Sequence, residues 1–468
     1  MARARAAVVM AAGQGTRMRS ALAKVLHPVA GRPMIHYAVR EALALGCAPV
    51  VVIVGHQREA VQARLAADFP GAPVVTAVQA EQRGTAHAVA CAGPALAGFA
   101  GDVFILSGDV PGLPAATLAE LDAAGGDAAV AVLGMKLADP AAYGRLVRGP
   151  GGELLSIVEY KDSTPAQKAI DEVNAGVYRV HADFLFDALG RVGSDNAQGE
   201  FYLTDIIGLS VEAGRGARTL VLAGDRALEA AGVNDRADLA AAEGRMQGRL
   251  RARLLAAGVT MIDPARLVLH DGVEVGPDSV LEPDVTLLGS TRVGRDCVIE
   301  QGCRLVDTAV ADGVHFKAYT VTEGASVGPD CTVGPFARLR EGTVLHAHVK
   351  VGNFVETKKA ELFDGAKASH LSYLGDATVG AGANVGAGTI TCNYDGKKKY
   401  RTTIGAGAFI GSDTQLVAPV AVGDGAYVAA GSTVTEDVPA GSLALSRTRQ
   451  QNIEGWVARK QAREAGQE

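Results

Sequence analysis

The chain has 468 residues, which is enough for two or three domains with separate hydrophobic cores. Hydrophobic residues make up 48% and charged residues 21% of it, as in globular proteins, and the net charge of −6 argues against a non-specific nucleic-acid binder. No apolar run approaches the ~18 residues of a membrane span, and the six cysteines form no CxxC pair of the kind that zinc sites use, so we expect a cytoplasmic protein with reduced thiols.

Residues 1–225 alternate short, Val-rich runs with helical patterns. The runs at 6–10, 50–54, 74–78, 103–107 and 128–133 are expected strands, and the segments 35–45 and 58–68 are expected helices. This rhythm predicts a parallel, doubly wound α/β sheet, in which ligands bind beyond the carboxyl ends of the strands. Residues directly after each strand are therefore candidate site residues.

A glycine-containing loop, residues 11–18, follows the first expected strand. It holds Gly13, Gly15 and Arg17, and Lys24 comes soon after it. Two glycines after a strand let backbone N–H groups approach phosphate oxygens, and the two cations suit a triphosphate. The loop matches neither the GxGxxG nor the P-loop pattern. For the glycines alone, an ordinary turn with solvated basic residues is the simpler explanation.

Two further segments point to a nucleotide and a metal ion. In residues 79–88, Gln79 carries an amide that can read a base edge, and Gly84 lets the chain pass close to a planar ring. The strand at 103–107 runs into Gly108 and Asp109, where a carboxylate is well placed for Mg²⁺ bound to phosphates. A loop before a helix and an Asp that caps a turn are the alternatives.

The pattern changes after residue 225. Residues 236–257 form one charged amphipathic stretch with few breakers, which predicts a helical connector. From about 262 to 440, an aliphatic residue followed by a small or acidic one recurs with a period of six, as in Val275-Gly276 and Val293-Gly294. This period is typical of the hexapeptide β-helix, in which three hexapeptides form one triangular coil and the coils stack.

Four stretches interrupt this period, at 305–322, 346–350, 358–375 and 393–403, and we expect them to be surface loops. His370 lies in the third. A histidine can take a proton from an ammonium group near neutral pH, so His370 is a candidate base for acyl transfer to an amine, although a surface histidine is the default explanation. The tail from Arg447 is polar and is expected to be helical and frayed.

Over essentially its whole length, the sequence resembles the bacterial family of bifunctional N-acetylglucosamine-1-phosphate uridylyltransferase/glucosamine-1-phosphate N-acetyltransferases. The likeness is carried by long strings, such as 11–18, 79–88 and 367–376. It implies a Rossmann-like α/β nucleotidyltransferase with a doubly wound mixed sheet at 1–232 and a helical linker at 233–257. It also implies an all-β left-handed parallel β-helix acetyltransferase at 258–445, followed by a tail at 446–468.

The resemblance implies two reactions of UDP-N-acetylglucosamine synthesis, which supplies precursors of peptidoglycan and lipopolysaccharide. The C-terminal half would acetylate glucosamine-1-phosphate with acetyl-CoA. The N-terminal half, with Mg²⁺ as its cofactor, would then transfer UMP from UTP to N-acetylglucosamine-1-phosphate and release pyrophosphate. The family also implies a homotrimer that works on small molecules, with neither nucleic acid nor membrane as a partner.

For the N-terminal half, the resemblance implies that Arg17 and Lys24 are catalytic and that Asp109 and Asn234 bind Mg²⁺. Ser107 stands where an aromatic residue is common in the family, and Met10 stands where Leu is usual. The residues implied to bind UDP-N-acetylglucosamine are Met10, Ala11, Ala12, Gly13, Lys24, Gln79, Gly84, Thr85, Ser107, Gly108, Asp109, Gly144, Glu159, Asn174 and Asn234.

For the C-terminal half, the resemblance implies that His370 is the catalytic base, and Ser369 before it stands where Gly is usual. The basic and aromatic stretch 393–401 would provide cations for acetyl-CoA. The implied glucosamine-1-phosphate ligands are Arg340, Lys358, Tyr373 and Asn384. The implied acetyl-CoA ligands are Ala387, Asn393, Tyr394, Ser412, Ala430 and Arg447.

Two other functions are compatible with the same pair of folds. One is a monofunctional nucleotidylyltransferase whose β-helix only regulates or assembles subunits, and the segments around His370 and Tyr394 argue against it. The other is a non-enzymatic interaction protein, which would not need Arg17, Lys24 and Asp109 together. Fold alone does not decide between them, because function resides in sites.

Overall fold

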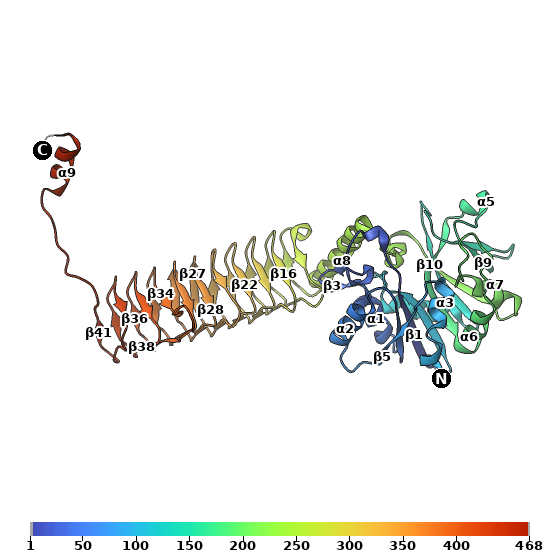
Figure 1. Ribbon diagram of the computed structural model, residues 1–468, viewed down its shortest axis with the longest axis horizontal. Helices are drawn as coiled ribbons and strands as arrows, with labels where there is room; N and C mark the ends of the chain where they lie inside the picture. The colour runs from blue at the N-terminus through green and yellow to red at the C-terminus, as the bar shows by residue number, and fades with distance from the viewer. Residues whose placement is uncertain (1–2, 467–468) are drawn as a thin grey trace. The chain divides into compact units, whose positions relative to one another are not determined.

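The computed structural model describes residues 3–466, and the chain divides into two compact units, Met1–Arg249 and Leu250–Glu468 (Figure 1). The division falls inside helix α8 (Arg236–Ala256), so the predicted connector is a helix whose residues belong partly to each unit. Among residues 3–466, no helix is both long and apolar enough to cross a membrane.

The first unit is built on a mixed sheet with the strand order β11-β7-β10-β6-β1-β4-β5. All of its pairings along this order are parallel except those of β10, which runs antiparallel to β6 and β7. The mixed sheet is confirmed, whereas the all-parallel sheet that the strand–helix rhythm predicts is wrong for β10. The strands are β1 (Arg5–Ala11), β4 (Val50–Val54), β5 (Val74–Val78), β6 (Asp102–Ser107), β7 (Val130–Lys136), β10 (Glu172–His181) and β11 (Ala217–Leu222), with the added pair β8 (Arg145–Arg148) and β9 (Leu154–Val158).

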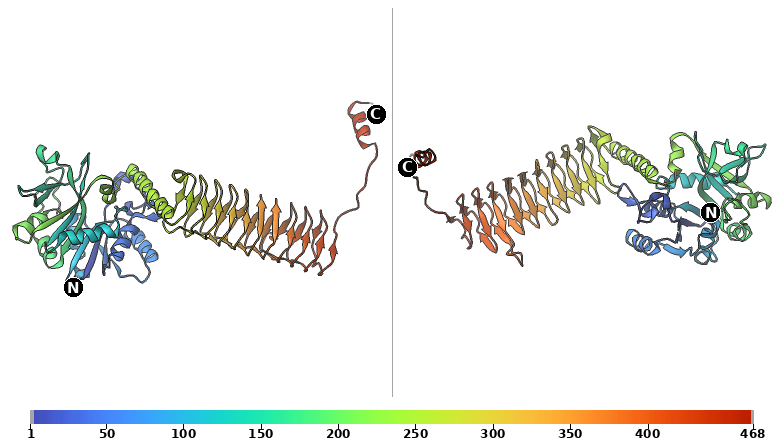
Figure 2. Two further views of the ribbon diagram at one scale, coloured as in Figure 1. Left: turned by 180° about the vertical axis from the view of Figure 1, so that it is seen from behind. Right: turned by 45° about the horizontal axis from the view of Figure 1, so that its top comes forward.

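Helices cover both faces of this sheet (Figure 2). Alternate residues of β1 enter different cores, since Ala7 and Val9 pack in one buried cluster and Ala6 and Val8 in the other. Because central strands of such a sheet are buried on both faces, they are apolar at every position rather than at every second one. One cluster includes residues of α1 (Met34–Ala44), α2 (Arg58–Asp68) and α4 (Ala115–Gly125), and the other includes residues of α3 (Thr85–Ala90), α6 (Ala182–Arg191) and α7 (Asp205–Glu212).

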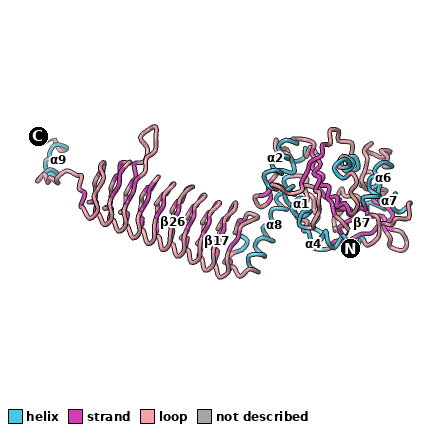
Figure 3. Tube along the Cα trace, turned by 90° about the horizontal axis from the view of Figure 1, so that it is seen from below, coloured by secondary structure: helices cyan, strands magenta, loops and turns pink. Residues whose placement is uncertain are grey.

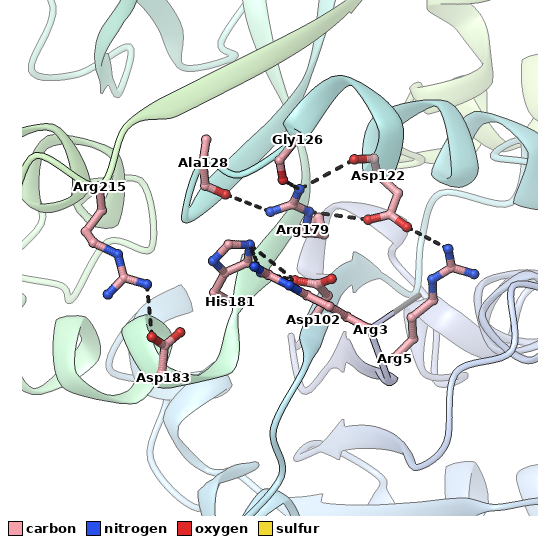
Figure 4. A network of polar contacts seen from close by, with 10 residues as sticks. All are labelled: Arg3, Arg5, Asp102, Asp122, Gly126, Ala128, Arg179, His181, Asp183 and Arg215. Carbon is pink, nitrogen blue, oxygen red and sulfur yellow. Dashed lines mark hydrogen bonds and ion pairs between the residues drawn. The ribbon is translucent and has the colours of Figure 1, made fainter. Parts of the chain in front are cut away.

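The two edges of the sheet differ in character. At the carboxyl ends of β1 and β6, Met10 pairs with Ser107, so the loops after these two strands meet. At the opposite edge, Arg3, Asp102 and His181 contact one another, and Arg179 contacts Asp122 and the carbonyls of Gly126 and Ala128 (Figure 4). Most candidate nucleotide residues lie at the ends of β1 and β6 or in the loops after β1, β5 and β6, and therefore belong to the first edge.

The second unit is a stack of coils that forms three parallel sheets of eleven, ten and nine strands within the described part of the chain. Each coil adds one strand to each sheet in turn, as β12 (Thr260–Met261), β13 (Val268–Leu269) and β14 (Glu274–Val275) do at the start. The eleven-stranded sheet continues through β15 (Val280–Leu281), β18 (Val298–Ile299), β21 (His315–Phe316), β24 (Thr332–Val333), β27 (Lys350–Asn353), β30 (Lys367–His370), β33 (Asn384–Val385), β36 (Phe409–Ile410), β39 (Tyr427–Val428) and β41 (Leu443–Ala444).

One buried aliphatic or aromatic residue per strand explains the period of six. Leu281, Ile299, Phe316 and Val333 are fully buried and occupy the same position on successive coils of the eleven-stranded sheet. Their side chains stack inside the coils, and each coil covers the apolar interior of the next. The predicted hexapeptide β-helix is thereby confirmed as a stack of parallel coils.

Three of the four predicted loops are wrong. Residues 305–322, 346–350 and 358–375 belong to regular coils, and their strands keep pairing with the coils on either side. The pattern is lost there because some coils are one residue shorter, as the register of Leu281 with Ile299 and then Phe316 shows. Only the fourth, between β34 (Ile390–Cys392) and β35 (Thr402–Ile404), is a true loop that leaves the stack (Figure 3). His370 therefore ends a strand instead of lying in a break.

Helix α9 (Trp456–Glu464) confirms the helical pattern that the sequence predicts for the tail. The remaining short elements of the first unit include the 3-10 turns η1 (Thr16–Met18) and η2 (Lys24–Leu26), which carry Arg17 and Lys24.

Candidate functional sites

A cavity of about 310 Å³ opens at the carboxyl edge of the first unit's sheet. Most of the residues that the sequence predicts for the nucleotide line it, and they come from the ends of β1 and β6 and from the segments after β1, β5 and β6. Its lining consists of Met10, Ala11, Ala12, Gly13, Lys24, Val25, Gln79, Gln82, Gly84, Thr85, Ala88, Ser107, Asp109 and Glu200. The sequence analysis missed Gln82 and Glu200. Gln82 lies within the string that carries the resemblance, whereas Glu200 has no local signal.

Backbone contacts fix the walls of this cavity. Gly108 donates its N–H to the carbonyl of Met10 at 2.9 Å, which locks the end of β6 beside the end of β1. Gly84 has φ +112, and a Cβ there would lie 2.5 Å from the carbonyl oxygen of Phe201. A side chain at this position would therefore collide with protein, so glycine is needed here whether or not a ring approaches it. Gln79 donates from Nε2 to the carbonyl of Gly84 at 3.2 Å.

Asp109 is held by two groups of the chain. The ammonium of Lys24 forms an ion pair with its Oδ2, and the Ser107 hydroxyl donates to its Oδ1 at 2.6 Å. Ser107, where the family commonly has an aromatic residue, thus orients the carboxylate that the sequence predicts as a metal ligand. The main-chain oxygen of Asp109 accepts the N–H of Val233 at 2.9 Å. This bond holds the segment that contains Asn234 next to Asp109.

Asn234 is in turn bound by the second predicted cation. Arg17 donates from Nη2 to Asn234 Oδ1 at 2.9 Å. Protein cations therefore contact both predicted metal ligands, Asp109 and Asn234. No group of three or more His, Cys, Asp or Glu that could hold a metal ion is found in residues 3–466. Mg²⁺ usually takes one or two protein oxygens and completes its shell with phosphates and water, so this pair of oxygens suits it.

A second cavity of about 560 Å³ is lined by Arg17 and Asn234 together with Tyr143 and Arg245. Neither cavity is lined by the three residues predicted for the sugar, Gly144, Glu159 and Asn174. These three lie together nonetheless. Asn174 donates its N–H to the carbonyl of Gly144 at 2.8 Å, and a Cβ on Gly144 would lie 3.4 Å from Glu159 Oε1.

Burial raises the pKa of the Glu159 carboxyl, and the nearby charges of Asp162 and Asp205 act in the same direction. The side chain of Asn174 donates from Nδ2 to the hydroxyl of Tyr178 at 2.8 Å, and its Oδ1 accepts the N–H of Gly176 at 2.8 Å. A half-buried carboxyl group and a fixed amide are the kind of polar pair that holds sugar hydroxyls.

In the second unit, one row of residues along the eleven-stranded sheet contains His370. Each member lies two positions after a buried residue, and these buried residues, Val351, Ala368, Val385, Ile410 and Val428, pair in register from coil to coil. We call the row of Asn353, His370, Ala387, Ser412 and Ala430 the base row. It brings the predicted base into line with three of the residues predicted for acetyl-CoA, and all of them but the base have small side chains.

The residues predicted for the sugar phosphate lie mainly on the ten-stranded sheet. Lys358 ends β28 (Glu356–Lys358), Tyr373 begins β31 (Tyr373–Gly375), and Arg340 follows β25 (Arg338–Leu339). Arg340 donates to Glu356 Oε1 at 2.7 Å, and Glu356 pairs in register with Tyr373.

The positive charge of Lys399, and after it that of Arg340, lowers the pKa of Lys358. Lysines and an arginine this close favour an anion between them. Lys399 belongs to the loop between β34 and β35, so this loop reaches the cluster. The sequence analysis placed Lys399 only in a basic stretch for acetyl-CoA. The fourth predicted ligand, Asn384, lies on β33 in register with Lys367.

The remaining acetyl-CoA candidates lie in or near the same coils. Asn393 donates from Nδ2 to Asp376 Oδ2 at 2.6 Å, while Tyr394 is 59% exposed on the loop that follows. Arg447 donates from Nη1 to the carbonyl of Ala430 at 2.7 Å, which joins two of the predicted residues directly. The predicted acetyl-transfer residues thus extend from the coil of β25 to the segment just after β41.

Family models match each part of the chain separately. The MobA-like NTP transferase domain matches residues 7–162, the GMPPB C-terminal domain matches residues 264–363, and the bacterial transferase hexapeptide (six repeats) matches residues 401–436. The first match contains Arg17 and Lys24, which follow β1, and Asp109, which follows β6. The hexapeptide match identifies the stacked coils as a left-handed β-helix.

Curated relatives cover nearly the whole chain. The chain is 50% identical to the bifunctional protein GlmU of Pelobacter propionicus over 457 residues, which span 97% of this chain and 98% of that protein. It is 57% identical to the bifunctional protein GlmU of Anaeromyxobacter sp. strain Fw109-5 over 458 residues, 98% of this chain and 93% of that one. The bifunctional protein GlmU of Geobacter sulfurreducens is 47% identical over 474 residues, 97% and 98% of the two chains.

Proposed function

The chain belongs to the GlmU family of bifunctional proteins, and we propose that each of its two reactions is carried by one of the two clusters described above. The C-terminal half acetylates glucosamine-1-phosphate with acetyl-CoA. The N-terminal half transfers UMP from UTP to N-acetylglucosamine-1-phosphate and releases pyrophosphate. The observation that carries the residue assignment is that the residues predicted for each reaction assemble within one unit, far apart in sequence but close in space.

In uridylyl transfer, a phosphate oxygen of the sugar-1-phosphate attacks the α-phosphorus of UTP, and the bond from that phosphorus to the bridging oxygen of pyrophosphate breaks. Lys24 and Arg17 bind the phosphates, for which they exchange their contacts with Asp109 and Asn234. Mg²⁺ bound by these two oxygens would neutralise the charge that builds up on the leaving pyrophosphate. The chain contributes position and fixed charge, and no covalent intermediate is needed.

In acetyl transfer, the amine of glucosamine-1-phosphate attacks the thioester carbonyl of acetyl-CoA. His370 takes the proton that the amine loses, and the coenzyme A thiolate leaves. Arg340, Lys358 and Tyr373 bind the sugar phosphate, and Ala387, Ser412 and Ala430 of the base row leave room for the acetyl group and the pantetheine arm. Tyr394 and the basic residues of its loop would bind the adenine and the phosphates of acetyl-CoA.

Trimer formation and a cytoplasmic location belong to this proposal as well. Tyr319, Phe336, Phe354 and Leu371 form an exposed apolar row on successive coils, which we call the aromatic row. Their exposed fractions are 47%, 49%, 56% and 60%, and the three rings stack on one another. Leu371 directly follows His370, so a second copy of the chain that covers this aromatic row would also border the base. The six cysteines are free thiols, which agrees with a reducing compartment.

A single assay with omissions tests the proposal. The protein receives Mg²⁺, UTP, acetyl-CoA and glucosamine-1-phosphate, and pyrophosphate and free coenzyme A thiol are measured. We expect omission of acetyl-CoA to stop both products, because the uridylyl acceptor is then never made. Omission of UTP should stop pyrophosphate alone. A monofunctional nucleotidylyltransferase would release no thiol under any condition, which would overturn the assignment of the second cluster.

A further inference from the structure

Asn353 precedes His370 in the base row and contacts it directly. The two residues pair in register between β27 and β30, and Asn353 Oδ1 lies 2.9 Å from His370 Nδ1. An amide oxygen can only accept a hydrogen bond, so the hydrogen of the neutral imidazole must lie on Nδ1. The lone pair then lies on Nε2, which is the form that a base requires.

The main chain holds the same two segments together. The carbonyl of Asn353 accepts the N–H of Leu371 at 3.0 Å, so Asn353 binds both His370 and the residue after it. A Cβ on Gly352 would lie 1.8 Å from the carbonyl oxygen of Ser369. Only glycine allows the two coils to approach this closely just before Asn353 and His370. Contacts with Asn353 on the preceding coil therefore fix the orientation of the His370 imidazole.

The chemistry of the partner also matters. A carboxylate at this position would stabilise the protonated imidazole, so that the imidazole could act as a base only at higher pH. The amide of Asn353 orients the ring without adding charge. In other bases of this kind, the group that holds the second ring nitrogen decides which nitrogen is available.

We infer that Asn353 is a positioning residue for acetyl transfer, which fixes the Nδ1–H tautomer of His370 and leaves Nε2 free to accept the proton of the amine. The inference rests on the proposed role of His370 as the base. None of the residues assigned to substrates above includes Asn353, and its side chain acts through His370.

Two variants of the full-length enzyme test it, Asn353→Leu and Asn353→Asp. Asn353→Leu keeps the approximate volume and removes the acceptor, so kcat of acetyl transfer should fall about tenfold or more with little change in either KM. Asn353→Asp restores an acceptor that carries charge, so the acid limb of the kcat/KM profile should move up by about one pH unit. A merely structural role would not move that limb.

The chain offers a matched control in Gln301, whose amide donates to the Tyr319 hydroxyl on the next coil at 3.1 Å. Gln301→Leu removes a comparable bond between coils outside the base row, and both activities should stay as they are. Uridylyl transfer should be unchanged in all three variants, because its proposed residues belong to the first unit.

Direct observation of the tautomer keeps the inference testable if the variants are unstable. In ¹⁵N-histidine-labelled enzyme, with the signal assigned through His370→Gln, neutral His370 should carry its hydrogen on Nδ1. A hydrogen on Nε2, or full acetyl transfer with an unshifted profile in both Asn353 variants, would overturn the inference. If His370→Gln itself retained acetyl transfer, the proposed base would fail instead, so the two failures are distinguishable.

Discussion

Arg17 donates a hydrogen bond to Asn234 Oδ1 at 2.9 Å, although 217 positions separate the two residues. The bond joins the loop after β1 to the segment that leads into α8, beside the Lys24–Asp109 ion pair. Each cation thus occupies one oxygen ligand: Lys24 and Asp109 line the nucleotide cavity, and Arg17 and Asn234 line the second cavity. We propose that phosphates take over the two cations when they bind, which would free the two oxygens for a metal ion.

Replacement of Asp109 tests this exchange. Asp109→Asn removes the charge that pairs with Lys24 and weakens a predicted Mg²⁺ ligand, so we expect uridylyl transfer to fall by about 10²-fold or more. Acetyl transfer should be unaffected, because Asp109 belongs to the first unit. Pyrophosphate release at saturating Mg²⁺ and UTP is the measurement. As a control, Asp171→Asn, on a surface pair with Lys136, should keep both activities. Unchanged pyrophosphate release in Asp109→Asn would contradict the assignment.

Replacement of His370 tests the second cluster. His370→Gln keeps polarity but cannot take a proton, so acetyl transfer should drop by about 10²- to 10⁴-fold, the usual contribution of a general base. The release of coenzyme A thiol is the measurement, and uridylyl transfer should be normal. His348 is an exposed histidine of the same unit, near Asp330, and His348→Gln should be silent. Equal losses in both variants would argue against a special role for His370.

The aromatic row gives a prediction about assembly. A charge in the middle of a stacked apolar surface must be desolvated when a second copy covers it, which costs several kcal/mol by the usual order of magnitude. We therefore expect Phe336→Glu to lower the molar mass in solution from that of a trimer, as measured by light scattering. Phe336→Leu should retain the trimer. If wild type and Phe336→Glu had the same mass, the row would not be the interface.

Burial of histidines in the first unit predicts how its stability depends on pH. Burial, followed by the charges of Arg179 and Arg3, lowers the pKa of His181 from 6.5, and Arg3 donates to its Nε2, which requires the neutral ring (Figure 4). Burial likewise lowers the pKa of His27 and of His36. The unfolded chain therefore binds more protons below about pH 6.5, so stability is complete above that pH and is lost as the pH falls through it.

His181→Gln removes one of these groups while keeping an acceptor for Arg3. Between pH 7.5 and 5.5, the variant should lose less stability than the wild type, by up to about 1.4 kcal/mol per pH unit. Urea unfolding followed by the helical signal measures this, because nearly all helices of residues 3–466 lie in the first unit. If the free energy of unfolding changed equally with pH in the wild type and in His181→Gln, His181 would not contribute to the pH dependence of stability.

The fold was predictable to the extent that local patterns determine it. The period of six predicts stacked coils because one buried residue per strand, such as Ile299 or Val333, recurs through them. The same pattern misplaces His370 in a loop, because one-residue changes in coil length shift the phase without breaking the coil. In the first unit, the Val-rich runs predict strands, but nothing local marks β10 as antiparallel.

The sites were predictable mainly through strings that the family shares. Local chemistry alone suggests Asp109 for a metal ion, but it cannot pair Asp109 with Asn234, since the contact through Val233 depends on the tertiary fold. Asn353 shows the same limit. Its partnership with His370 depends on the register of two coils, and no spacing rule for a single strand contains it. Glu200 enters the nucleotide cavity from a loop without any motif.

A complementation assay tests most directly the claim that one polypeptide carries two independent active sites. Asp109→Asn and His370→Gln are each supplied with glucosamine-1-phosphate, acetyl-CoA, UTP and Mg²⁺, singly and as a mixture, and UDP-N-acetylglucosamine is measured. We expect almost none from either variant alone and substantial synthesis from the mixture, because the acetylated intermediate made by one variant is used by the other. A mixture as inactive as the single variants, with both proteins folded, would contradict the claim.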